Sequence, residues 1–193
     1  MKFFLNSEAA NWCKAAPRSL ALLGEVSPSF GGLVTHGIKS EVPSSYTVVI
    51  QLLNRLLTVP TEGGFEGGLV WQLNWWSEKE SEQVALNIIN RVRQGYGESR
   101  SLEDSPAYLF ESCELCDAIT FLIHPLLNAW AAQFVAANGQ YFLTATVSGY
   151  LYFVARDNKI VERVLENTAG WKPRREIPGR LKQDNSIVSA SPD

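Results

Sequence analysis

The sequence predicts a single α+β domain in which helices cover at least one face of a mostly antiparallel or mixed sheet. Alternating apolar residues mark several strands, and apolar residues at every third or fourth position mark helices between them. Two tight-turn dipeptides near the end of the chain link three strands into an antiparallel meander. The 193 residues, 46% apolar and 19% charged, have a globular composition. We expect one domain over 1–170 and an extended or disordered tail over 171–193.

The first sixty residues predict two helices separated by a loop. Ser7 is a favourable helix cap and predicts a short helix over 8–15, which stops before Pro17. Residues 24–45 are rich in Gly, Pro and Ser, which is the composition of a loop. Residues 46–59 predict a helix that ends before Pro60. Its buried stripe is expected to consist of Val49, Leu52, Leu53, Leu56 and Leu57.

A strand and a long helix are predicted after a glycine-rich connector over 63–68. Residues 69–75 alternate as a strand does. Its apolar face is expected to consist of Leu69, Trp71, Leu73 and Trp75. Ser77 and Glu80 have the spacing of a capping box, and the helix that they open ends at Gly95. The buried stripe of that helix is expected to consist of Val84, Ala85, Ile88, Ile89 and Val92.

A second strand and helix follow. Residues 108–110 predict a short strand after Pro106. Ser112 is a favourable cap for the next helix. Pro125 is expected to break or kink this helix, because proline lacks the amide hydrogen that would bond to residue 121. The buried stripe is expected to consist of Leu115, Ala118, Ile119, Leu122 and Ile123.

The end of the domain predicts the meander and a closing helix. Asn138-Gly139 favours a type I′ turn between strands over 133–137 and 140–147. Ser148-Gly149 predicts a second tight turn before a strand over 150–155. The closing helix is marked by Ile160, Val161, Val164 and Leu165.

The charge distribution favours a protein partner over nucleic acid. The chain has a net charge of −3, whereas nucleic-acid-binding proteins usually carry a basic surplus. Residues 61–120 contain eleven acidic residues but only four basic ones, a net charge of −7. An acidic face of this kind attracts a basic partner and speeds its association. The same charges are also typical of an ordinary solvated surface.

The cysteines and the first residues predict a cytoplasmic protein. Three cysteines cannot all pair within one chain, and reduced thiols are typical of the cytoplasm. The apolar residues after Lys2 give way to Asn6, a stretch far too short for a secretory signal. Residues 119–137 are just long enough to cross a bilayer. Because His124 and Pro125 interrupt them, we expect a buried core helix and no membrane span.

Cys113 and Cys116 form a CxxC motif at a predicted helix start, where the helix amides lower thiol pKa values. A dithiol redox site is one interpretation. Neighbouring acids oppose it, because negative charge raises the pKa of a thiol; they are Glu111, Glu114 and Asp117. A zinc site would need two more ligands from Cys13, His36 and His124, which lack paired spacing. We therefore expect neither a metal nor a cofactor.

Two further patterns are weak. Cys113 and His124 are the residue types of a thiol hydrolase, but eleven helical positions separate them by about 16 Å. A nucleophile and its base must approach to about 3 Å. Residues 149–154 resemble the aromatic RNA-stacking strand of an RNA-recognition motif. They lack its leading basic residue, and Ala155 stands in place of its last aromatic, so we expect no nucleic-acid partner.

Aromatic and basic residues in the middle of the chain suggest a binding surface. Trp75 and Trp76 point to opposite faces of a strand. One of them can then cover a pocket or anchor a partner, unless the strand is buried between two layers. Arg91, Arg93 and Arg100 are candidates for an anion site, or for ion pairs with the nearby acids.

Several short motifs occur in order through the middle of the chain. They are Trp76-Ser77-Glu78 after an apolar strand, Arg93 with Tyr96-Gly97 and Arg100, Pro106 to Phe110, Glu114 with Asp117, and Trp130 before the hairpin. In these motifs, residues 69–155 resemble a family of uncharacterised small bacterial proteins. The chain has Ala107-Tyr108 where the family has Gly-His. The resemblance implies a soluble bacterial protein and gives no support for a catalytic activity.

Two functions remain open. The first is a non-enzymatic interaction protein, of the immunity or regulatory type, that binds a basic protein partner through an acidic face containing Glu78, Glu80 and Glu82. The second is a small-molecule-binding protein or enzyme. Its pocket would lie near Trp75, Trp76, Arg93 and Tyr108.

Overall fold

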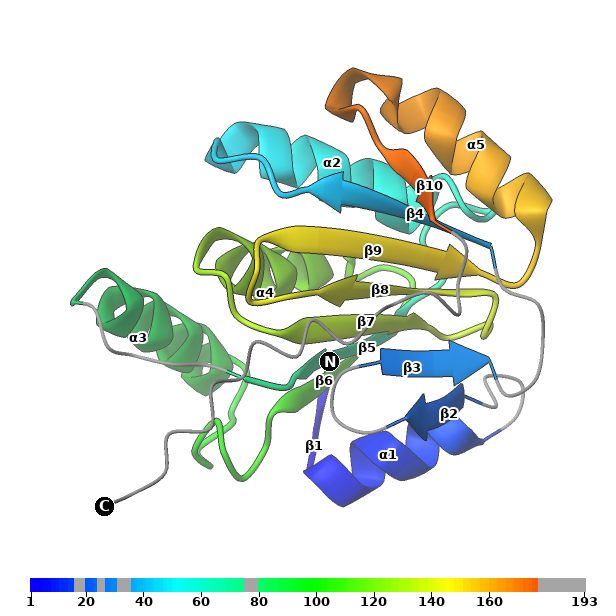
Figure 1. Cartoon of the computed structure of the whole chain (residues 1–193). Helices are drawn as coiled ribbons and strands as arrows, with labels where there is room; N and C mark the ends of the chain where they lie inside the picture. Colours follow the sequence, from blue (N-terminus) through cyan, green and yellow to red (C-terminus); the bar gives the residue numbers. More distant parts are fainter. Residues whose placement is uncertain (16–19, 24–26, 31–35, 75–79, 177–193) are drawn as a thin grey trace, which may run out of the picture.

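The computed structural model describes residues 1–15, 20–23, 27–30, 36–74 and 80–176, which have an α+β fold (Figure 1). The helices of this part are α1 (Asn6–Lys14), α2 (Tyr46–Thr58), α3 (Glu80–Gly95), α4 (Leu115–Leu127), α5 (Asn158–Thr168) and the 3-10 turn η1 (Ala169–Trp171). The strands are β1 (Lys2–Phe4), β2 (Leu20–Leu23), β3 (Ser27–Phe30), β4 (His36–Glu41), β5 (Gly68–Gln72), β6 (Ala107–Phe110), β7 (Ala132–Ala136), β8 (Tyr141–Ala145), β9 (Tyr150–Ala155) and β10 (Arg174–Glu176).

One antiparallel sheet organises the chain. Its eight strands follow the order β1-β6-β5-β7-β8-β9-β4-β10, and β2 pairs with β3 in a separate ribbon. All neighbours in the large sheet are antiparallel, so the predicted α+β class with a C-terminal meander is confirmed.

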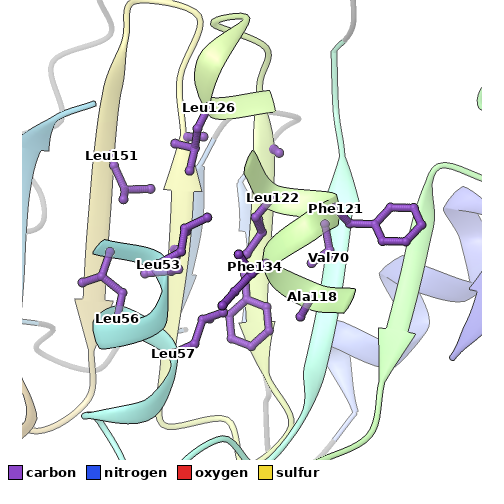
Figure 2. Packing of buried hydrophobic residues seen from close by; sticks show 14 of the residues in the cluster. Leu53, Leu56, Leu57, Val70, Ala118, Phe121, Leu122, Leu126, Phe134 and Leu151 are labelled. Atoms are coloured by element: carbon purple, nitrogen blue, oxygen red, sulfur yellow. The ribbon is translucent and has the colours of Figure 1, made fainter. Parts of the chain in front are cut away.

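The sheet separates two apolar cores. Helices α2, α4 and α5 pack on one face, where Leu53, Leu122 and Phe134 meet (Figure 2). On the other face, Ala9 and Cys13 of α1 belong to a smaller core, which also contains Leu69, Trp71, Ala107, Val135, Phe142 and Val154. Because both faces are covered, every residue of β5, β7 and β8 is buried.

The helices with the clearest periodicity are where the sequence predicts them. The predicted helix over 46–59 is α2, and its five predicted core residues are the ones that are buried. The closing helix is α5, which begins after Asp157; the side chain of Asp157 accepts a hydrogen bond from the amide of Lys159.

The predicted loop over 24–45 is wrong, because β3 and β4 lie within it. Strand β4 pairs with β9 along its whole length and with β10 on its other side. Its strand geometry comes from these partners, which lie more than a hundred residues further along the chain. The Gly, Pro and Ser content of residues 24–45 is local and does not indicate these distant partner strands.

The predicted buried stripe of α3 is wrong at two positions. Val84 is 54% exposed and Ile88 is 42% exposed, while Ala85 and Ile89 are buried. Helix α3 lies at one side of the sheet, apart from α2 and α5 (Figure 1). Only its inner side therefore meets the core. Ser77, the expected cap of this helix, lies outside the described residues.

The start of α4 and the first hairpin turn also differ from expectation. Glu114, not Ser112, is the N-cap of α4, and the helix continues through Pro125 to Leu127. The amide of Gly139 donates to the carbonyl of Ala136, and Gly139 has φ 69°. Asn138 is not among the residues with positive φ, so the turn is not type I′. Of the Asn138-Gly139 dipeptide, only Gly139 is left-handed.

Part of the expected tail has regular structure. Within 171–176, Trp171 ends η1, and Arg174–Glu176 forms β10 at the edge of the sheet. The strand is only three residues long and carries two arginines, features that discourage further strands from pairing with a sheet edge. Across the described ranges, no helix is both long and apolar enough to cross a membrane.

Candidate functional site

Arg93 is the largest fully buried side chain of the described residues, with 1% of its surface exposed. Its Nη2 donates to the carbonyl oxygens of Ser101 at 3.0 Å and Ser105 at 3.1 Å. Its Nη1 lies 3.4 Å from Oδ1 of Asn90. The hydrogen bonds of Arg93 thus link the end of α3 to the loop over 96–106, which leads into β6.

Glu98 and Arg100 form an ion pair in the same loop. The Nε of Arg100 donates to Oε1 of Glu98 at 2.9 Å, and its Nη2 donates to Oε2 at 2.6 Å. Ser105 Oγ donates to the same carboxylate at 3.2 Å. Mainly because of the Arg100 bond, the pKa of Glu98 falls to about 2. The buried carboxylate of this loop is therefore already engaged by Arg100.

The Glu98 ion pair predicts a specific acid sensitivity. Its folded-state pKa lies below the ordinary value, so its contribution to stability is full above about pH 4.5 and is lost as the pH falls toward about 2. We expect the loss of stability caused by Glu98→Gln to be large at neutral pH and to shrink over this range. Urea unfolding of both proteins at neutral and acidic pH measures it. An equal loss at both pH values would contradict the assignment.

Tyr108 lies against Arg93. The guanidinium carbon of Arg93 is 5.9 Å from the ring centroids of both Tyr108 and Phe3. The Tyr108 ring also meets Phe3 edge-on at 5.7 Å and Phe121 at 4.3 Å between centroids. Phe121 points from α4 toward β6 (Figure 2). Tyr108 is completely buried, and this burial raises the pKa of its hydroxyl.

The structure brings together two of the seven predicted site residues, Arg93 and Tyr108. Trp75, Trp76 and Glu78 lie outside the described residues. Glu80 and Glu82 lie in the first turn of α3. Arg91 is exposed on α3, and Arg100 pairs with Glu98. Phe3 joins the site from β1 near the N-terminus, and no local pattern in the sequence could place it there.

A second candidate is the outward side of α3. Val84 and Ile88 are one helical turn apart and exposed, and Arg91 is exposed close to one turn further on. Glu80 precedes Val84 by one turn. We call the stripe of Val84, Ile88 and Arg91 the α3 outer face.

The cysteines do not assemble a reactive centre with His124. Cys113 and Cys116 are exposed and free, whereas Cys13 is buried in the smaller core. Cys113 precedes α4, and His124 lies in its last turn, where burial lowers the pKa of the imidazole. In the described residues, no three His, Cys, Asp or Glu side chains gather where they could hold a metal ion.

A small apolar depression lies away from Arg93, between α2, α5 and strands β4 and β9. Its cavity volume is about 10 Å³, the room that one water molecule takes. The lining residues include Ile38, Leu52, Leu56, Phe153 and Trp171. This space is too small for a metabolite.

Comparison of the chain with protein-family models, with curated proteins and with solved structures finds no match.

Proposed function

We propose that this is a binding protein without catalytic activity of its own, and that it docks a basic protein partner on the α3 outer face. One observation carries the proposal. Val84 and Ile88, which the periodicity of α3 marks for burial, are 54% and 42% exposed. Apolar side chains that lie together at the surface with charged neighbours are typical of interaction sites. A partner that covers them supplies the burial that the fold leaves incomplete.

The way α3 is attached supports this role. Two of its described apolar side chains, Ala85 and Ile89, are fully buried in the main core. The side of the helix that carries Val84, Ile88 and Arg91 is exposed and available for contact. An amphipathic helix that offers apolar residues one turn apart is a common ligand for a groove on another protein.

Charge supports a basic partner. In the sequence, Glu80 stands four positions before Val84, and Glu78 stands two positions before Glu80. Acidic residues beside an apolar contact steer a basic partner into place and raise the association rate, an effect that salt weakens. Arg91 lies toward the other end of α3 from these acidic residues. This difference in charge between the two ends of the helix sets the orientation in which the partner binds.

The thiols support a reducing compartment such as the cytoplasm. No disulfide joins any of the three cysteines, and Cys113 and Cys116 are exposed. Exposed thiols persist in reduced form where the glutathione and thioredoxin systems operate.

The docking proposal predicts that Val84→Asp and Ile88→Asp each weaken partner binding about tenfold or more, because each places a charge in an apolar contact. Tagged full-length variants are compared as baits in a lysate of the source cells, at low and high salt, with mass spectrometry of the retained proteins. Val147→Asp is the matched control, because Val147 is 56% exposed on the turn between β8 and β9.

The supporting result is a basic protein that the wild type and Val147→Asp retain at low salt, and that both α3 variants lose. Retention of the same proteins by all four baits would refute the docking surface.

A further inference from the structure

We infer that Arg93 and the buried residues around the end of β5 and the start of β6 form a binding site for a small monovalent carboxylate. Four side chains there carry buried polar atoms without a hydrogen-bond partner: Gln72 (Nε2 and Oε1), Arg93 (Nε), Tyr108 (Oη) and Trp130 (Nε1). None of these side chains is more than 2% exposed. Buried polar groups in folded proteins are nearly always partnered. Such a concentration of unpartnered groups indicates a ligand site.

The sheet register places these residues on one face. Val70 pairs with Tyr108, and Gln72 follows Val70 on the same side of β5. Gln72 pairs with Ala132, and Trp130 precedes Ala132 by two positions. Tyr108 and Trp130 both belong to the helix-covered core. Arg93 reaches the Tyr108 ring from α3, at 5.9 Å. The register and the Arg93–Tyr108 contact therefore place the four residues around the point where β5 ends and β6 begins.

The charge of the cluster selects an anion. All three hydrogen bonds of Arg93 go to neutral oxygens, and its buried guanidinium pairs with no carboxylate of the described residues. Glu98 is engaged by Arg100. A buried charge is costly unless a counter-charge accompanies it. The site thus has one uncompensated positive charge, which a single carboxylate balances and a phosphate dianion exceeds.

The donor types agree with this ligand. The unpartnered groups include the N–H of Arg93, the O–H of Tyr108, the indole N–H of Trp130 and the amide NH₂ of Gln72. Oxygen atoms of a carboxylate accept several such bonds, and bonds to a charged acceptor are about twice as strong as neutral ones.

Access to the site requires α3 to move. This helix carries Arg93. Of its described apolar side chains, Ala85 and Ile89 are buried, Leu86 and Val92 are partly buried, and Val84 and Ile88 are exposed. Elements with few buried apolar contacts open at lower free energy than the core. The ligand would enter during such an opening, and the return of Arg93 would complete the site. This inference is independent of the proposed docking function.

Nuclear magnetic resonance of the full chain tests the site with sodium acetate as the probe and sodium chloride at equal ionic strength as the reference. The readouts are the indole N–H signal of Trp130, assigned with Trp130→Phe, and the Nε–H signal of Arg93. We expect saturable shifts of both signals with acetate, weaker shifts with inorganic phosphate and none with chloride. Shifts that do not saturate, or that chloride reproduces, would overturn the inference.

A pair of tyrosine variants gives the second test. Tyr108→Phe removes one donor and keeps the ring, so acetate should bind about tenfold more weakly. Tyr141→Phe is the control, because Tyr141 is equally buried but its hydroxyl already donates to the carbonyl of Leu57 at 3.1 Å. Its acetate affinity should equal that of the wild type. Equal affinities for the Tyr108 variant and the wild type would show that the cluster does not bind the probe.

Discussion

Replacing Arg93 with alanine is expected to destabilise the protein by about 3–5 kcal/mol, the range seen when large buried side chains are truncated. The substitution leaves the carbonyl of Ser105 without its donor and leaves a void beside the rings of Phe3 and Tyr108. It also releases the loop over 96–106 from α3. Urea unfolding followed by circular dichroism measures the change.

Arg91→Ala is the matched control for this prediction. Arg91 lies two residues earlier on the same helix and is exposed, so its loss should change the free energy of unfolding by less than about 0.5 kcal/mol. If the two alanine variants were equally stable, Arg93 would have no structural role at the end of α3.

Replacing Gly68 with alanine is expected to destabilise the sheet by about 2–4 kcal/mol, because the added methyl group overpacks a closed interior. A Cβ atom at Gly68 would lie 2.5 Å from Cζ of Phe134 and 2.5 Å from the carbonyl oxygen of Val135. The oxygen belongs to the backbone of β7, so the pairing of β5 with β7 must shift. That pairing also positions Gln72 beside Ala132.

Gly95→Ala provides the comparison for the Gly68 variant. A Cβ atom at Gly95 meets nothing within 4 Å, and its φ is not positive. Alanine in a helix is favoured over glycine by about 0.5–1 kcal/mol, so this variant should be slightly more stable than the wild type. Thermal unfolding of Gly68→Ala, Gly95→Ala and the wild type compares the three stabilities. A Gly68 variant as stable as the wild type would refute the tight contact with β7.

The sequence predicts those parts of the fold whose signals are local. Helix α2 has a complete apolar stripe, and the meander has a turn dipeptide between each pair of strands, so both are found where expected. Strand β4 is missed because its partners β9 and β10 are distant in the sequence. Val84 and Ile88 are assigned to the core because periodicity shows which side of a helix is apolar, but not how wide a surface it meets.

Some residues of the candidate site could be predicted from the sequence, and others are recognised only in the structure. The sequence analysis names Arg93 and Tyr108 as candidate binding residues because their side chains can form charged or polar contacts with a ligand. The structure places the two side chains in contact. Gln72 and Trp130 carry no such signal. Their role depends on polar atoms that the fold buries without partners, a property that exists only once β5, β6 and β7 are paired.

The proposed docking of a partner on α3 is tested most directly by hydrogen–deuterium exchange of the full chain, with and without the partner captured by the wild-type bait. The account predicts slower exchange of backbone amides over 84–92 when the partner is bound, with no change at the turn around Val147. Slower exchange at that turn or elsewhere, with α3 unaffected, would contradict the account and move the partner to another surface.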